Sequence, residues 1–377
     1  MRRIEHERPA RPPEGAKVGF REALLRATGA GRLCKAGRGT PATTRSRAAA
    51  NRSHPRPRAG GRGVGTVNTA PLHIEYESLG DPARPVIVLI MGLGMQLTGW
   101  PDSFCQALVA RGYRVIRFDN RDCGLSGRAP AKKRANLLLA MAAATLGLPV
   151  RTPYTLEHMA GDTIGLMDRL GLQQAHIVGA SMGGMIAQVL AAKFPQRVLS
   201  LTSIMSTSGN RRVSKPTKPA RKVLLARPAD PENTDAVIEH MVDMFGVIGS
   251  PAYPSTREEL RLQIGRSVRR AYYPAGIARQ LLAVIASGDR RKQLRTISAP
   301  TLVIHGADDP LVPLAAGRDT AQHIPGAALL VVEGMGHDFP EALMPRLATA
   351  IADHCDKSYT ASPVAEAAQA SDSVLRR

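Results

Sequence analysis

Short apolar, β-branched runs alternate with longer stretches of helical periodicity from about residue 71 onward. Val86–Ile90 reads V-I-V-L-I without a polar residue, which is typical of a strand buried on both faces of a sheet. This alternation predicts an α/β fold, with a mostly parallel sheet covered by helices on both faces. Ligands of such sheets bind outside the carboxyl ends of the strands, so the residues that follow each strand are the candidate site residues.

The alternation divides the chain into parts. Strands are predicted at His73–Tyr76, Val86–Ile90, Tyr113–Phe118, Ala175–Val178, Val198–Ile204, Thr301–His305 and Ala328–Val332. Helices are predicted at about Trp100–Arg111, Thr155–Leu170, from the turn after Val178 to Phe194, and at Leu314–Ile324. A last helix is predicted after the strand Ala328–Val332, ending at about Cys355. Residues 210–297 contain helical stretches such as Thr234–Phe245 and Arg257–Ala271 but no strand pattern. We therefore expect a helical cap at 210–297, inserted between core segments 67–209 and 298–357.

Positive charge is concentrated at the N-terminus. The chain of 377 residues carries a net charge of +20, and residues 1–66, with 16 Lys/Arg and 4 Asp/Glu, account for 16 − 4 = +12 of it. This segment is rich in Arg, Pro, Gly and Ala and is predicted to be disordered, as is the tail 358–377. It could be a nucleic-acid-binding arm, an organelle transit peptide, or the result of a start codon assigned too early. The last is favoured because recognisable structure begins almost directly after Val67, and no nucleic acid partner is expected for the core.

Several other classes of site find no support in the sequence. The four cysteines, Cys34, Cys105, Cys123 and Cys355, form no C-x-x-C pair, so neither a disulfide framework nor a zinc site is indicated and a reducing cytoplasm is favoured. With no phosphate-binding glycine loop and no metal-ligand cluster, we expect no cofactor and no metal. The longest apolar run, Leu137–Val150, is too short to span a bilayer. We expect it to form a buried or pocket-lining helix rather than a membrane-surface helix, and no membrane partner; no pattern specifies an oligomeric state.

A glycine-rich turn, G-A-S-M-G-G, follows the strand Ala175–Val178. Gly179 and Gly183 would give room for a sharp strand-to-helix bend with Ser181 at its centre. The serine would stand at a helix N-terminus, where backbone amides favour developing negative charge. An ordinary N-cap serine is the alternative interpretation of this turn alone.

An acid and a histidine follow two later strands. G-A-D-D-P follows Thr301–His305, and E-G-M-G-H-D, which contains His337, follows Ala328–Val332. An imidazole can accept the proton of a serine while a carboxylate fixes its tautomer. The order Ser…Asp…His is that of the nucleophile-elbow enzymes, although the sequence alone leaves Asp308 and Asp309 both open.

The segment from about residue 71 to 355 resembles the α/β-hydrolase superfamily. M-G-L-G-M-Q-L-T-G-W-P-D, R-F-D-N-R-D-C-G-L-S and G-A-S-M-G-G-M resemble a bacterial esterase-like group that includes aclacinomycin methylesterase. The resemblance implies Ser181 as nucleophile, His337 as base and Asp309 as acid, because the family pattern is G-x-x-D; Asp308 is the runner-up. It implies an oxyanion hole from the backbone amides of Met182 and Leu93, with Gly92 as the alternative to Leu93. Relatives often have His-Gly where this chain has Met91-Gly92, a departure that matters little for a backbone donor.

The same resemblance gives the other residues their expected roles. Asp119 and Arg121 are expected to brace neighbouring turns.

A serine nucleophile argues against haloalkane dehalogenases and soluble epoxide hydrolases, which use Asp at that position. The implied function is hydrolysis of a small-molecule carboxylic ester through an acyl-enzyme. Alternatives are a cofactor-free perhydrolase (haloperoxidase-like), a C–C bond hydrolase, or a non-catalytic ligand-binding protein. Six cap residues could line a pocket or pack as core: Met241, Met244, Phe245, Tyr253, Tyr272 and Tyr273.

Overall fold

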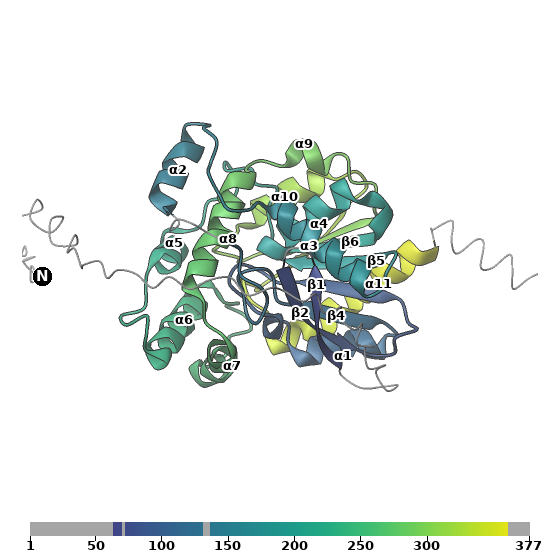
Figure 1. Ribbon diagram of the computed structural model, residues 1–377, viewed down its shortest axis with the longest axis horizontal. Helices are drawn as coiled ribbons and strands as arrows, with labels where there is room; N and C mark the ends of the chain where they lie inside the picture. Colours follow the sequence, from purple (N-terminus) through teal and green to yellow (C-terminus); the bar gives the residue numbers. More distant parts are fainter. Residues whose placement is uncertain (1–62, 70–71, 131–135, 361–377) are drawn as a thin grey trace, which may run out of the picture. The chain divides into compact units, whose positions relative to one another are not determined.

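The structure is a computed structural model that describes residues 63–69, 72–130 and 136–360 (Figure 1). These residues form an eight-stranded sheet in the order β1-β2-β4-β3-β5-β6-β7-β8. The strands are β1 Gly63–Thr69, β2 Leu72–Leu79, β3 Val86–Ile90, β4 Arg114–Phe118, β5 Ala175–Ala180, β6 Val198–Ile204, β7 Thr301–Gly306 and β8 Ala328–Val332. β2 pairs antiparallel with β1 and β4, and the other neighbours pair in parallel. The carboxyl ends of β3, β4, β5, β6, β7 and β8 therefore share one edge of the sheet.

Helices follow the strands and also fill the interval between β6 and β7. They are α1 Asp102–Ala110, α2 Leu137–Thr145, α3 Leu156–Arg169, α4 Met182–Lys193, α5 Lys218–Leu225, α6 Thr234–Ile248, α7 Arg257–Arg270, α8 Pro274–Ser287, α9 Arg291–Leu294, α10 Leu314–His323 and α11 Met344–Thr360. With the strands they confirm the predicted α/β architecture of a mostly parallel sheet.

The sheet is buried on both faces, as the run V-I-V-L-I predicts. Val88 and Ile90 face one apolar cluster, which is completed by residues of α3 and α4 such as Met159, Leu166, Met185 and Ile186. Ile87 and Leu89 face a second cluster with residues of α1 and α11 such as Phe104, Leu108, Leu347 and Ile351. Because successive side chains of a strand point to opposite faces, a strand between two helical layers must be apolar at every position.

Strand β1 was not predicted, and it begins inside the segment that composition predicts to be disordered. It starts at Gly63, and its seven residues pair with Leu72–Ser78 of β2. A Cβ atom at Gly65 would lie 2.6 Å from the Tyr76 hydroxyl and 2.8 Å from its ring. Gly65, which belongs to the composition that predicts disorder, therefore gives the Tyr76 ring room to cross the strand. At the other end, α11 continues to Thr360, beyond the expected boundary at residue 358.

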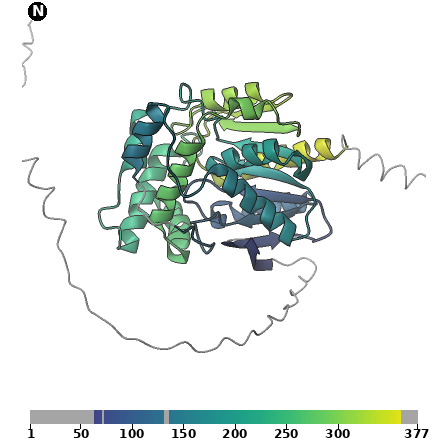
Figure 2. The same ribbon diagram turned by 45° about the horizontal axis from the view of Figure 1, so that its top comes forward.

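The helices outside the two layers form a cap, which we define as α2 and α5–α8. Figures 1 and 2 show these helices gathered beyond one edge of the sheet. α6 and α7 share a small apolar core, whose buried members are Val237, Ile238, Val242, Leu260, Ile264 and Val268. α2 belongs to the first core segment in sequence, yet it packs against α8, and Arg211 donates to the carbonyl of Ala144 over 2.7 Å. The cap is thus built from two separate parts of the chain.

The expectation for the longest apolar run is wrong. α2 was predicted to be buried or pocket-lining, but Ala140 is its only buried residue, and Leu138 is 82% exposed. The run is apolar on every side of the helix, whereas the α8 contact covers one side only. No helix in the described ranges is long and apolar enough to cross a bilayer.

A buried cation links two strands to α1. The Arg117 side chain on β4 is 1% exposed and lies 2.8 Å from the Glu77 carboxylate on β2 and 2.5 Å from that of Asp102. It also donates to the Trp100 carbonyl over 2.5 Å. Burial disfavours this charge, and the two carboxylates offset that cost.

We predict that Arg117→Met lowers the free energy of unfolding by ~3 kcal/mol, because Glu77 loses its cation in a mostly buried site. The measurement is equilibrium unfolding in urea. Arg111→Met is the matched control, since Arg111 pairs with Asp353 and Asp356 at the surface. Its unfolding midpoint should stay at the wild-type value, and an equal loss in both variants would contradict the assignment.

Candidate active site

Ser181 is the single residue between β5 and α4, and the backbone bends sharply there. Its φ of 54° and ψ of −118° lie in a region that costs an L residue ~1–3 kcal/mol. Two hydrogen bonds hold the bend: the Ser181 N–H donates to the Ile204 carbonyl over 2.9 Å, and the Ser206 hydroxyl donates to the Ser181 carbonyl over 2.7 Å. The last residue of β6 and the segment after it thereby fix a conformation that the serine would not adopt by itself.

The glycines of this turn give the room that was predicted. A Cβ atom at Gly179 would lie 2.2 Å from the Gly183 carbonyl oxygen, and one at Gly183 would lie 2.0 Å from the carbonyl oxygen of Ile90. A Cβ atom at Gly184 would lie 2.6 Å from Ser206 Cβ. No side chain fits at these distances, so only glycine lets α4 start this close to the sheet.

Ser181, His337 and Asp309 are brought into one chain of hydrogen bonds. His337 Nε2 lies 3.0 Å from Ser181 Oγ, and His337 Nδ1 lies 2.7 Å from Asp309 Oδ2. A carboxylate only accepts, so Nδ1 carries the proton and Nε2 is free to accept one from the serine. Asp309 and His337 are buried, while Ser181 is half-buried.

The two adjacent acids have different partners. Asp309 Oδ1 accepts from the backbone N–H groups of Leu311 and Val312 over 2.9 and 2.8 Å, which leaves Oδ2 for His337. Asp308 is exposed and accepts from the Gly334 N–H over 3.0 Å. Of the two candidates open in the sequence, Asp309 is therefore the one that contacts the histidine.

A second histidine, not singled out in the sequence, lies behind Asp309. The buried His305 has Nε2 2.7 Å from the Val312 carbonyl and 3.7 Å from Asp309 Oδ2. Burial lowers the pKa of His305, although the Val312 carbonyl and the Asp309 charge oppose the shift. The only sign of this contact in the sequence is that His305 lies four residues before Asp309. A single histidine at a strand end indicates little unless its burial is known.

The loop that carries His337 rests on the C-terminal end of α6. The His337 N–H donates to the Ile248 carbonyl over 2.7 Å, and the Gly336 N–H donates to Ser250 Oγ over 2.9 Å. Ser250 also donates to the Asp338 carboxylate, whose pKa is raised by burial. These partners in the cap were not predicted, because nothing in a single sequence links Ile248 and Ser250 to a loop almost ninety residues later.

The turn after β3 lies against the serine. A Cβ atom at Gly92 would be 3.2 Å from Ser181 Cβ. Across the part of the chain that the structure describes, neither the Leu93 N–H nor the Met182 N–H donates to a protein acceptor. The turn is held from behind, since Asn120 donates to the Met91 carbonyl over 2.9 Å.

Asp119 and Arg121 connect this region to its surroundings. Asp119 is fully buried and accepts from the backbone N–H groups of Leu97 and Leu125, over 2.8 and 2.9 Å, and from Arg270 of α7 over 2.6 Å. Burial raises the pKa of Asp119, and these donors oppose it. Arg121 forms two hydrogen bonds with Asp162 of α3, of 2.5 and 2.6 Å. Asp119 thus has the contacts with neighbouring turns that were expected, whereas the Arg121 side chain braces helix α3 instead.

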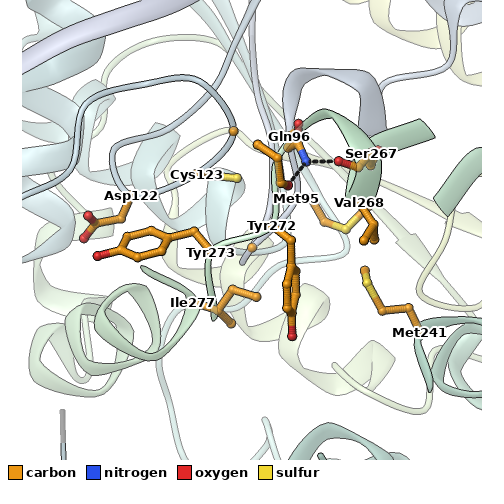
Figure 3. A pocket seen from close by; sticks show the side chains of 13 residues that line it. Met95, Gln96, Asp122, Cys123, Met241, Ser267, Val268, Tyr272, Tyr273 and Ile277 are labelled. Carbon is orange, nitrogen blue, oxygen red and sulfur yellow. Dashed lines mark hydrogen bonds between the residues drawn. The ribbon is translucent and has the colours of Figure 1, made fainter. Parts of the chain in front are cut away.

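A small, mostly apolar cavity of about 30 Å³ lies between the cap and the turns after β3 and β4 (Figure 3). Of the six cap residues that could line a pocket, Met241, Tyr272 and Tyr273 do so. Phe245 packs on the cap core instead, Tyr253 packs on the sheet core, and Met244 is half-buried away from the cavity. Lining residues that the sequence did not indicate include Met95, Gln96, Asp122, Val268 and Ile277.

We predict that Gly183→Ala destabilises the fold by ~2 kcal/mol or more, because the new methyl group meets backbone that has no room to move. Thermal unfolding measures the change. The matched control is Gly161→Ala in α3, where a Cβ atom meets nothing within 4 Å and alanine favours the helix. The control should unfold at or above the wild-type temperature, and a Gly183→Ala variant of wild-type stability would contradict the packing argument.

The sequence is similar to named hydrolases. A rhodomycin D methylesterase of Streptomyces peucetius is 30% identical over 304 residues, which cover 74% of this chain and 93% of the relative. A 3-oxoadipate enol-lactonase of Acinetobacter baylyi is 26% identical over 268 residues, which cover 71% and 88%.

Solved structures share the fold. The enol-lactonase from Burkholderia xenovorans LB400 aligns with a TM-score of 0.59 at 24% identity, over 77% of this chain and 99% of its own. The meta-cleavage product hydrolase from Pseudomonas fluorescens IP01 aligns with a TM-score of 0.62 at 23% identity, over 78% and 98%. The sequence family described as the alpha/beta hydrolase fold matches residues 85–242 and 257–341. By this match and its methylesterase relatives, the chain belongs to the α/β-hydrolase family and is a hydrolase.

Proposed function

We propose that the protein hydrolyses a carboxylic ester by acyl transfer, with Ser181 as nucleophile, His337 as general base and Asp309 as its orienting acid. One observation carries the proposal: the hydrogen-bonded chain from Asp309 through His337 to Ser181 Oγ, at 2.7 and 3.0 Å. A histidine within hydrogen-bond distance of a serine and oriented by a buried carboxylate is the arrangement that activates a serine hydroxyl.

In the proposed reaction Ser181 Oγ attacks the ester carbonyl while His337 Nε2 accepts its proton. The Leu93 and Met182 N–H groups donate to the oxyanion, a role worth ~3 kcal/mol for each donor. His337 then gives the proton to the departing alcohol, which leaves an acyl ester on Ser181. Water, deprotonated by His337, attacks this ester and releases the carboxylic acid and the free serine. Every step uses the chain's own residues, and the proposal includes no cofactor.

The substrate class rests on the relatives. The relatives named rhodomycin D methylesterases support a small-molecule ester and, among esters, the methyl ester of a polyketide-like compound. We place the protein in the cytoplasm, which agrees with three buried free cysteines among the described residues: Cys105, Cys123 and Cys355.

We predict that Ser181→Ala lowers kcat/KM for a short-chain nitrophenyl ester by at least ~10³-fold, because the nucleophile is lost. Ser255→Ala, in the loop before α7, is the control and should keep full activity. Hydrolysis by Ser181→Ala at the wild-type rate would refute the mechanism. Hydrolysis only in the presence of peroxide, or only of vinylogous diketones, would instead favour the perhydrolase or the C–C hydrolase, and binding without turnover would favour a ligand-binding protein.

The adjacent acids give a second test. We predict that Asp309→Asn lowers kcat by about 10³–10⁴-fold, since an amide does not hold the His337 tautomer or stabilise the imidazolium. Asp308→Asn keeps the exposed contact with Gly334 and should retain most of the activity. The comparison is made on the same ester with both variants at wild-type unfolding temperature. Equal losses in the two variants would overturn the assignment of Asp309.

A further inference from the structure

Large apolar side chains are exposed together on one surface of the cap. We call this surface the apolar cap face and define it by Leu138, Leu139 and Met141 of α2 and by Leu146 and Leu148 of the turn that follows. Leu138 and Leu146 are 82% and 73% exposed. Soluble proteins rarely expose a contiguous patch of this kind unless something binds there.

The apolar cap face is part of a well-formed helix. Asn136 caps α2 by accepting from the Leu139 N–H over 3.0 Å. At the other end Gly147, with φ 69°, lets the Leu148 N–H return to the Ala143 carbonyl over 2.8 Å, a glycine C-cap. Because the backbone is satisfied at both ends and one side of the helix packs on α8, the leucines are held outward by the fold.

A basic segment of the chain starts beside this face. Arg211 donates to the Ala144 carbonyl and to Thr145 Oγ1 over 2.7 and 3.2 Å, so the segment leading into α5 starts at the end of α2. Residues 211–229 contain no acidic residue. They contain seven exposed basic residues: Arg211, Arg212, Lys215, Lys218, Arg221, Lys222 and Arg227. The exposed Leu225 of α5 adds an apolar side chain among them.

Exposed leucines bordered by lysines and arginines are the composition that binds the surface of an anionic lipid layer. The apolar side chains enter the boundary between headgroups and acyl chains, and the cations attract the headgroup charge. The nine residues of α2 span about 14 Å, less than half of the ~30 Å hydrocarbon core, so the helix can lie in the interface but cannot cross it.

We propose that the cap docks through the apolar cap face on an anionic lipid surface. A second copy of the chain fits less well, because a two-fold contact through this face would bring the same basic segment against itself. The proposal replaces the expectation that the protein has no membrane partner. It does not depend on the catalytic roles proposed for Ser181, His337 and Asp309.

A tryptophan placed in the face tests the proposal on the full-length chain. The sequence has one tryptophan, Trp100, which is fully buried, so a second one reports on its own surroundings. We expect the emission of Leu138→Trp to shift to the blue on mixed phosphatidylserine–phosphatidylcholine vesicles. Leu262→Trp, at a 60% exposed leucine of α7 outside the face, is the matched control and should not shift.

Charge reversal in the Leu138→Trp background tests the basic segment. Lys218→Glu with Lys222→Glu should weaken binding to the mixed vesicles about tenfold or more. Lys292→Glu with Arg346→Glu changes the net charge equally, on α9 and α11, and should leave binding unchanged.

Three results would overturn the proposal. The chain could sediment with vesicles while the Leu138→Trp emission stays unshifted, which would assign binding to another part of the chain. The emission could shift with protein concentration alone, which would assign the face to a second copy. Both charge-reversal pairs could weaken binding equally, which would reduce the effect to net charge. Hydrolysis of a soluble nitrophenyl ester by Leu138→Trp at the wild-type rate, with vesicle binding present or lost, separates this test from that of the catalytic proposal.

Discussion

The close approach of Gly183 to the Ile90 carbonyl determines where the rest of the site can lie. With no side chain at that point, α4 starts against the end of β3, and the turn between β5 and α4 has to bend at Ser181. The same approach brings the turn after β3 beside the serine, so two backbone segments and one hydroxyl meet in a small volume. The strain at Ser181 is maintained by contacts with Ile204 at the end of β6 and with Ser206 after it. It follows from how closely the chain packs more than from any property of serine itself.

Charged groups join the cap to this edge of the sheet. Asp119, in the turn after β4, is paired with Arg270 of α7, and Asp122 is held by two hydrogen bonds from Arg279 of α8, over 2.6 and 2.7 Å. Both acids are almost fully buried, so each needs its cation. The cap therefore satisfies buried charges of the core in addition to covering the cavity, because α7 carries the cation of Asp119 and α8 carries that of Asp122.

Local patterns predicted those parts of the protein that depend on neighbouring residues. The strand Val86–Ile90 was predicted at its observed bounds, and the glycine turn and the order of acid and histidine indicated the residues that now lie within hydrogen-bond distance. What was missed depends on contacts distant in sequence. The packing of Ser250 under the histidine loop, the cover of Gly65 by Tyr76, and the exposure of α2 are all decided by which element lies opposite, and periodicity contains no information about that.

The hydrogen bonds from the His337 loop to Ile248 and Ser250 have a consequence for how the cap can differ between related proteins. His337 belongs to the core in sequence, but its loop is hydrogen-bonded to the Ile248 carbonyl at the end of α6 and to the Ser250 hydroxyl. A cap exchanged for that of a relative would therefore bring its own hydrogen-bond partners for the His337 loop, along with its own cavity-lining residues. The cavity lining and the position of His337 would then change together, unless residues 248–250 of the original chain were kept.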